Sequence, residues 1–156
     1  MSTHPKHETK LRLGEHRFFH DFEPAFVGLL QKEAEERRYA PGDLLVREGD
    51  PADKFLLIFE GKVALEIATP EKPHLTIETI GAGDALGWSW LFPPQQWRLD
   101  GRALKETRAL VLDAGFVREL LEAHPPEAYQ FVLRLLPMVA ERLENTRVQL
   151  LDIYGA

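Results

Sequence analysis

The sequence predicts a mainly β domain, an antiparallel sandwich or barrel, with helices before and after it. Short runs of β-type residues between 39 and 113 alternate with glycine- and proline-containing turns, a spacing typical of antiparallel sheets and not of parallel βαβ units. On either side of this zone the apolar residues instead recur at helical spacing. A chain of 156 residues is long enough for one domain with a real core and short for two.

The runs of the central zone are expected to form strands. Leu75, Ile77 and Thr79 follow the period of two that is typical of a strand with one buried face. The stretch from Phe55 to Phe59 is apolar without a break, which predicts a strand buried on both faces. The expected strands are LLVRE (44–48), KFLLIFE (54–60), KVALEIA (62–68), HLTIETI (74–80), WRLDGRAL (97–104) and TRALVLD (107–113).

The chain is expected to consist of a flexible terminus, residues 1–10, and a single domain, residues 11–156. The terminus is polar and without periodicity, and no role is assigned to it. Within the domain we expect N-terminal helices over 11–38, the β unit over 39–113 and C-terminal helices over 114–156.

Proline and charge patterns set the expected helix boundaries. Pro24 suits the first turn of a helix, and the charged stretch 33–38 is expected to be a solvated helix face. A short helix over 114–122 should end at His124 and the two prolines that follow it. A long helix should then run over about 127–154.

The long C-terminal helix carries two apolar stripes. The stripe of Phe131, Leu135 and Met138 is expected to pack on the β unit. The other stripe alternates steps of three and four residues, as in a coiled-coil seam, and it continues further than a core-facing surface requires. It predicts a partner helix, most simply from an identical subunit. The seam comprises Tyr129, Val132, Leu136, Val139, Leu143, Thr146, Leu150 and Ile153.

The composition excludes several functional classes. The chain has 25 acidic and 19 basic residues and a formal net charge of −6, which argues against direct contact with nucleic acid. The absence of cysteine rules out disulfides and thiolate zinc sites and fits a reducing compartment. No apolar stretch is long enough for a signal core or a membrane span. We therefore expect a cytoplasmic protein that has no membrane contact.

No arrangement of residues predicts catalysis or metal binding. The sequence contains no nucleophile–base constellation and no phosphate loop or dinucleotide fingerprint, so we expect no enzyme and no catalytic residue. His16 and His20 stand four residues apart, a spacing that could bind one metal ion, but no third ligand follows nearby. We therefore expect a surface or half-buried histidine pair and no metal site.

The segment "YAPGDLLVREGDPADKFLLIFEGKVAL", residues 39–65, resembles the start of the cyclic-nucleotide-binding domain family. This family provides the sensor module of catabolite-activator-type regulators. The matching features are the Pro-Gly-Asp turn at 41–43, the Arg-Glu-Gly-Asp turn at 47–50, the apolar run and Gly61. The resemblance implies a jelly-roll-type β-roll, wrapped by N-terminal and C-terminal helices, that dimerises along its long last helix.

The resemblance also implies a ligand site in "GAGDALGWSWLFPPQQW", residues 81–97, which contains every tryptophan of the chain. In the family, a short helix after this glycine-rich turn cradles a cyclic phosphate with its first amides. A Glu after the last Gly of the turn holds the ribose hydroxyl, and an Arg followed by Ser or Thr and Ala binds the phosphate. Here Gly87 matches, but Trp88 stands at the Glu position. An indole offers a donor and no acceptor.

The position of the phosphate arginine is open between two registers. One register places Arg98 there, followed by Leu99, and the other places Trp97 there. Both lose the Arg-Ser/Thr-Ala signature, so neither cyclic AMP nor cyclic GMP is expected to be the ordinary ligand. In the last helix, Thr146 stands where catabolite-activator-type members contact the purine, with Arg142 one turn earlier.

Two hypotheses about function follow. The first is a dimeric regulatory sensor whose pocket is rebuilt for a small-molecule or nucleotide-like effector, with an anion received by the helix amides after Gly87. The second is a ligand-free, dimeric protein-interaction module in which the tryptophans fill the pocket. No DNA-binding helix-turn-helix follows the last helix in this sequence, so we expect the output to pass through a partner protein or the dimer. The candidate ligand-binding residues are Gly87, Trp88, Ser89, Trp97, Arg98, Leu99, Arg142 and Thr146.

Overall fold

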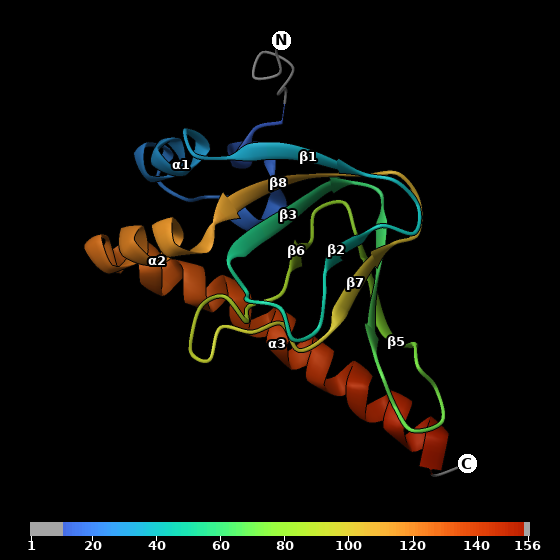
Figure 1. Ribbon diagram of the computed structural model, residues 1–156. Helices are drawn as coiled ribbons and strands as arrows, with labels where there is room; N and C mark the ends of the chain where they lie inside the picture. The colour runs from blue at the N-terminus through green and yellow to red at the C-terminus, as the bar shows by residue number, and fades with distance from the viewer. Residues whose placement is uncertain (1–10, 155–156) are drawn as a thin grey trace.

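The computed structural model of the protein describes residues 11–154, and the side chains of residues 11–152. Figure 1 shows strands at the centre with helices beside them. The helices are α1 (Pro24–Gln31), α2 (Ala114–Ala123) and α3 (Pro125–Tyr154), and two 3-10 turns, η2 (Leu13–Glu15) and η3 (Arg17–Phe19), precede them. The strands are β1 (Glu35–Tyr39), β2 (Leu44–Val46), β3 (Lys54–Glu60), β4 (Lys62–Ile67), β5 (Leu75–Gly81), β6 (Ala85–Leu86), β7 (Asp100–Ala103) and β8 (Thr107–Asp113).

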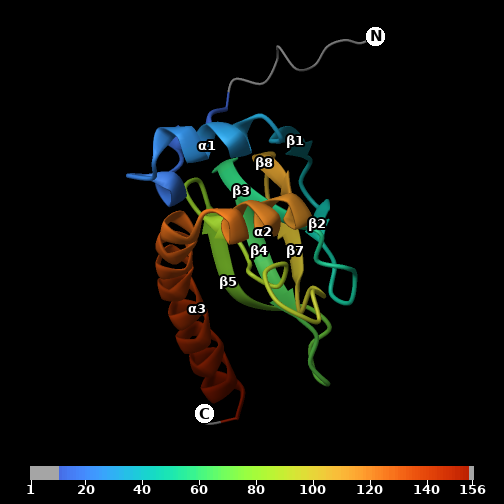
Figure 2. The same cartoon turned by 90° about the vertical axis from the view of Figure 1, so that its left-hand side faces the viewer.

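The strands form two four-stranded antiparallel sheets, with the orders β1-β8-β3-β6 and β2-β7-β4-β5. The buried side chains of both sheets form one core together with the helices. In Figures 1 and 2 the shorter helices lie at one end of this β-roll, and α3 runs from there along its side, next to β5. The predicted mainly β class with flanking helices and a long C-terminal helix is confirmed.

The strand predictions from apolar runs are largely confirmed. β3 and β8 have the predicted bounds, and residues 55–58 of β3 are fully buried, as an unbroken apolar run predicts. β6 was not predicted, because two residues are too few to show a period. Its pairing with Leu56 and Leu57 of β3 defines it instead.

The expected N-terminal helical zone, residues 11–38, is wrong at its end. Residues 35–39 form β1, which pairs with β8 from Glu35 opposite Val111 to Tyr39 opposite Thr107. The charged stretch is therefore no solvated helix face. The Glu36 carboxylate is largely buried and lies 2.8 Å from the guanidinium of Arg108. This partner stands 72 residues later in the chain, so local spacing could not reveal the strand.

The N-terminal segment before α1 consists of short 3-10 turns and not of a continuous helix. Pro24 opens α1, as predicted. Arg134 of α3 fastens the segment to the body of the domain: its guanidinium donates hydrogen bonds to the carbonyl oxygens of Phe18 at 2.6 Å and His20 at 2.9 Å. Because donors in such bonds are charged, they are stronger than ordinary amide hydrogen bonds.

The two stripes of α3 have different surroundings. Phe131 and Leu135 are buried, and Met138 packs against the core, so the predicted core-facing stripe is confirmed. In the seam, Tyr129, Val132, Leu136, Leu143 and Leu150 are exposed, whereas Val139 and Thr146 are half-buried. The side chain of Ile153 lies outside the described residues. Over residues 11–154, no helix combines the length and the apolar character needed to cross a membrane.

His16 is buried in its neutral form. Only 3% of the residue is exposed, and both ring nitrogens have backbone partners. Nε2 donates to the carbonyl oxygen of Ile58 at 2.9 Å, and Nδ1 accepts from the amide of Phe18 at 3.1 Å. A second proton on Nδ1 would face that amide hydrogen. Burial lowers the pKa of His16 below its ordinary value of 6.5. His20 is exposed, so the expected histidine pair with a shared face does not exist.

The stability of the domain should fall in mild acid because of His16. Since its pKa is lower in the folded chain, the unfolded chain binds the proton first. The contribution of His16 is therefore complete above the unfolded pKa and is lost as the pH falls towards the folded pKa. Urea unfolding at about pH 7.5 and about pH 5.5 should show a smaller pH dependence for His16→Gln than for the wild type. The matched control, His20→Gln, should behave like the wild type. Equal pH dependence in all three proteins would contradict the assignment.

Candidate functional site

The segment of residues 81–97, called the cassette below, leaves the β-roll at Gly87. Gly87 has φ +77°, in the left-handed region that glycine tolerates best. A Cβ atom built there would lie 2.7 Å from Cζ3 of Trp97. Two features therefore require glycine at this position: the positive φ of the backbone and the indole ring that lies against it.

The helix that the resemblance implied after Gly87 is absent from the described cassette. A single turn stands in its place, closed by the amide of Leu91 and the carbonyl oxygen of Trp88 at 3.0 Å. Pro93 and Pro94 follow and have no amide hydrogen to continue helical hydrogen bonding. The expected short helix is therefore wrong, whereas anion binding by the backbone amides after Gly87 stays a prediction.

The three tryptophans have separate surroundings. Trp90 is fully buried, and its ring centroid lies 4.7 Å from that of Phe55 and 5.8 Å from that of Phe131. It belongs to the core and does not line a pocket. Trp97 is buried against Gly87, and Trp88 is half-buried beside α3. The sequence motif thus supplies one core residue and two wall residues.

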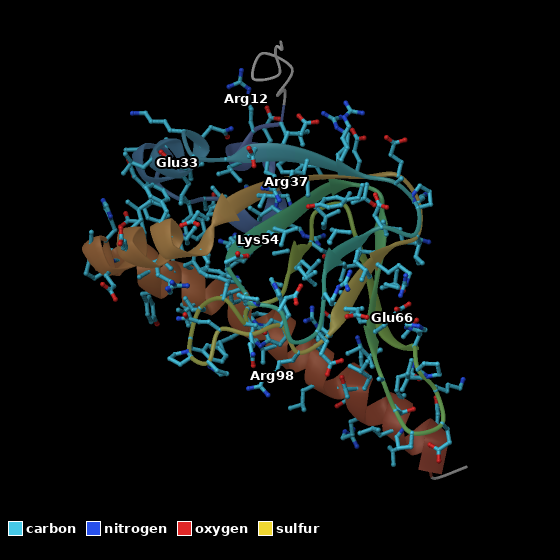
Figure 3. The ribbon with its side chains drawn as sticks, in the orientation of Figure 1. Arg12, Glu33, Arg37, Lys54, Glu66 and Arg98 are labelled. Atoms are coloured by element: carbon cyan, nitrogen blue, oxygen red, sulfur yellow. The ribbon has the colours of Figure 1, made fainter. Side chains whose placement is uncertain are left out.

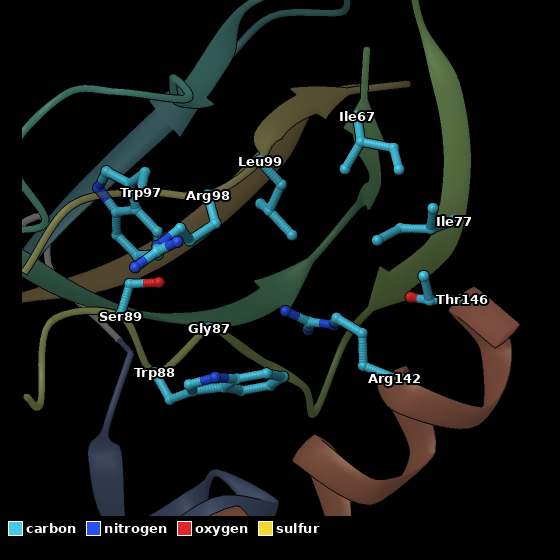
Figure 4. Close-up of a pocket in the computed structure, with 10 residues that line it drawn as sticks. All are labelled: Ile67, Ile77, Gly87, Trp88, Ser89, Trp97, Arg98, Leu99, Arg142 and Thr146. Atoms are coloured by element: carbon cyan, nitrogen blue, oxygen red, sulfur yellow. The ribbon is translucent and has the colours of Figure 1, made fainter. Parts of the chain in front are cut away.

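A cavity of about 240 Å³ lies between the cassette, the second sheet and α3. Figure 4 shows its lining. The structure brings together all the candidate ligand-binding residues around this cavity, and adds Ile67 of β4 and Ile77 of β5. Ile77 belongs to the alternating run that predicted a buried face, but the sequence could not tell that this face meets the cassette. The predicted lining residues are Gly87, Trp88, Ser89, Trp97, Arg98, Leu99, Arg142 and Thr146.

Arg142 of α3 contacts the two other walls of this cavity, the second sheet and the cassette. The residue is only 7% exposed. Its Nε donates to Oε1 of Glu78 in β5 at 2.8 Å, and its guanidinium carbon lies 4.3 Å from the centroid of the Trp88 ring. The interaction with the ring face is a cation–π contact. Glu78 was missed from the sequence, because a glutamate on an alternating strand gives no sign of a partner 64 residues away.

The position of the phosphate arginine falls on Trp97 in one register and on Arg98 in the other, and both residues line the cavity. Trp97 is held by backbone hydrogen bonds to the Gly49–Asp50 turn, at 2.8 Å and 2.9 Å. Arg98 is exposed and directs its guanidinium towards Ser89 (Figure 4). Within residues 11–152, Arg98 is therefore the arginine that follows the cassette and lines the cavity.

The described residues contain one group with metal-ligand chemistry outside this cavity. Glu66, His74 and Asp100 place one potential ligand atom each within 4.8 Å of one another. Arg102, however, donates to the same Glu66 oxygen that faces His74, at 3.2 Å. A guanidinium at this carboxylate opposes a cation, and Asp100 accepts a hydrogen bond from the amide of Glu48.

The fold corresponds to that of a known domain family. The family described as "Cyclic nucleotide-binding domain" matches residues 36–124, more than half of the chain. The chain belongs to the cyclic nucleotide-binding domain family. Such domains are regulatory modules and not enzymes.

A relative of this cyclic nucleotide-binding domain is described as a transcriptional regulator. The domain is 27% identical over 135 residues to the "CRP-like cAMP-activated global transcriptional regulator" of Mycobacterium tuberculosis, a match that covers 86% of this chain and 58% of that protein. The chain thus spans less than two thirds of that relative's length.

Two solved structures have the same fold. The cyclic nucleotide-binding domain from Methylobacillus flagellatus KT is 27% identical, with a TM-score of 0.73, over 86% of this chain and 75% of that chain. The N-terminal domain of a transcriptional regulator from Streptomyces coelicolor A3(2) is 28% identical, with a TM-score of 0.66, over 88% and 94%. The jelly-roll-type β-roll expected from the sequence is confirmed.

Replacing Gly87 with alanine should destabilise the cyclic nucleotide-binding domain more than replacing Gly42. Both glycines have positive φ, +77° and +94°, but a Cβ at Gly42 meets nothing within 4 Å. Gly42→Ala should therefore cost only the backbone term, about 1 kcal/mol. Gly87→Ala should cost about 1–3 kcal/mol more, because Trp97 must move. Urea unfolding measures both, and equal losses would show that the Trp97 contact imposes no constraint.

Proposed function

We propose that this cyclic nucleotide-binding domain is a regulatory sensor whose effector is a small molecule other than cyclic AMP or cyclic GMP. The observation that carries the proposal is the open cavity whose lining lacks a carboxylate after Gly87. Trp88 stands at that position, and its ring lies under Arg142. The Trp88 indole offers no acceptor to a ribose hydroxyl, and an unpaired buried polar group is costly.

The neighbouring carboxylate does not replace the missing one. Glu78 directs an oxygen at Arg142, 2.8 Å away, and its side chain is only 15% exposed. Recruiting Glu78 to a sugar would leave Arg142 without its partner, and breaking a buried ion pair is strongly unfavourable. The similar regulator of Mycobacterium tuberculosis is described as cAMP-activated, whereas the effector proposed for the present domain is a different small molecule.

The cavity also favours the sensor over the ligand-free interaction module. In the second hypothesis the tryptophans would fill the pocket. Trp90 does fill the core, but Trp88 and Trp97 border a space of about 240 Å³. Small-molecule sites are typically concave and mostly apolar with few polar groups, and this cavity has that composition.

We further propose that the domain acts as a homodimer in the cytoplasm and passes its signal through the dimer or a partner protein. The exposed seam of α3 supports the dimer, since Leu143 is 69% exposed and Leu136 is 53% exposed. Large apolar side chains repeated at heptad spacing favour a second helix. The net charge of −6 argues against direct DNA contact by this domain.

Calorimetric titration tests the nature of the ligand. Cyclic AMP and cyclic GMP should bind more weakly than about 1 mM, because neither the ribose acceptor nor the Arg-Ser/Thr-Ala signature is present. Native mass spectrometry of the gently purified protein should detect a bound small molecule. Micromolar binding of cyclic AMP would contradict the first expectation. Protein that carries no small molecule and binds none from a metabolite panel would favour the interaction module.

The Leu143→Glu variant tests the dimer. Glutamate from both subunits would place like charges in the seam, so the variant should be a monomer by multi-angle light scattering at concentrations where the wild type is a dimer. The matched control is Val148→Glu, because Val148 is also exposed on α3, at 44%, but lies away from the seam. A wild type that is monomeric at about 100 μM, or a dimeric Leu143→Glu variant, would contradict the seam.

A further inference from the structure

The charges around the cavity leave a single positive charge without a partner. Arg142 is neutralised by Glu78 at 2.8 Å. Arg98 is exposed, and no ion pair among the side chains of residues 11–152 involves it. Among the side chains that the structure describes, Arg98 and Arg142 are the charged ones that line the cavity. A ligand with one negative charge would therefore balance this site, whereas a second negative charge would have no counterpart.

One of the remaining walls is aliphatic and the opposite one is planar, so the space between them is flat. Ile67, Ile77 and Leu99 form an aliphatic wall, and the Arg142 guanidinium, stacked on Trp88, forms the opposite one (Figure 4). A guanidinium is planar and stacks on aromatic rings. A planar aromatic group between these walls would continue the stack begun by Trp88. A sugar in this place would set its hydroxyls against aliphatic side chains and lose hydrogen bonds to water.

The polar groups of the cassette define how such a ligand would be oriented. Arg98 and Ser89 lie together on one side of the cavity, and Ile77 and Thr146 lie on the other side (Figure 4). An acid group at Arg98 would receive charge-assisted hydrogen bonds. Because Arg98 is exposed, the acid would also keep part of its water, while the ring entered the apolar side.

We propose that the pocket binds a compact, flat aromatic monoanion, with Arg98 as the residue that selects its charge. This inference rests on the proposed sensor function and names the ligand class of that site. We assign this role to Arg98 because it has no ion-pair partner among the described side chains, whereas Arg142 is paired with Glu78. We infer an aromatic ring in the ligand because a space lies between Leu99 and Arg142.

Isothermal titration calorimetry of the whole chain with three matched probes tests the proposal. The probes are 2-naphthoate, the neutral 2-naphthamide and the dianion 2,6-naphthalenedicarboxylate, which share one ring system and differ in charge. The monoanion should bind at least about 10-fold more tightly than the amide, and the dianion should bind no more tightly than the monoanion. Cyclic AMP is titrated alongside.

Two charge-neutralising variants separate the pocket from the overall charge of the protein. Arg98→Gln should reduce the preference for the acid over the amide to less than about 3-fold. Arg12→Gln changes the net charge equally at the opposite end of the molecule (Figure 3) and should leave the preference unchanged. Arg98→Lys keeps the charge and should retain most of the preference. In Glu78→Gln, Arg142 loses its carboxylate partner, so the dianion should bind at least about 5-fold more tightly to this variant than to the wild type.

The outcomes distinguish this inference from the sensor proposal. Equal binding of acid and amide, or an unchanged preference in Arg98→Gln, overturns the ligand class and leaves the sensor function standing. Failure of all three probes, together with a different small molecule found by native mass spectrometry, does the same. Tighter binding of cyclic AMP than of every probe overturns both proposals.

Discussion

The burial of Trp90 is the interaction on which the rest of this structure depends. Its ring packs against Phe55 of β3 at 4.7 Å and Phe131 of α3 at 5.8 Å, and its carbonyl oxygen accepts a hydrogen bond from Arg118 of α2 at 2.7 Å. One residue of the cassette thus joins the β-roll to both C-terminal helices. A buried aromatic side chain of this kind contributes about 3–5 kcal/mol, enough to hold the cassette in place without a helix of its own.

The pocket and the predicted dimer seam both involve α3. Arg142 and Leu143 are consecutive residues of α3, yet the first is 7% exposed at the cavity and the second is 69% exposed at the seam. Successive helical residues point about 100° apart, so a single helix can serve both surfaces. A ligand that moved Arg142 would act on the same turn of α3 that meets the proposed partner, which would give the proposed sensor a short physical path from its effector to the proposed dimer.

The parts of the fold that were predicted from the sequence are those with a local signal. The apolar run at 55–58 shows its burial in its own composition, and the lining residues of the cassette follow from Gly87 and the motif around it. The parts that were missed have their cause elsewhere in the chain. β1 is polar and becomes a strand by pairing with β8, and Glu78 becomes part of the site through Arg142. Neither partner can be found by examining a window of neighbouring residues.

The sequence by itself determined the mainly β class and the two apolar stripes of α3, because periodicity and turn glycines act over a few residues. The resemblance to the family supplied the candidate ligand-binding residues, and the structure added Ile67 and Ile77 to the lining of the cavity. Only the tertiary structure decided what each tryptophan does. Trp88 and Trp90 are separated by one residue in the sequence, yet Trp90 enters the core and Trp88 lies under Arg142. The tertiary structure also decided that Arg142 has an ion-pair partner and that Arg98 has none within the described part of the chain. An ion pair depends on which distant side chains the fold brings within a few ångströms of each other.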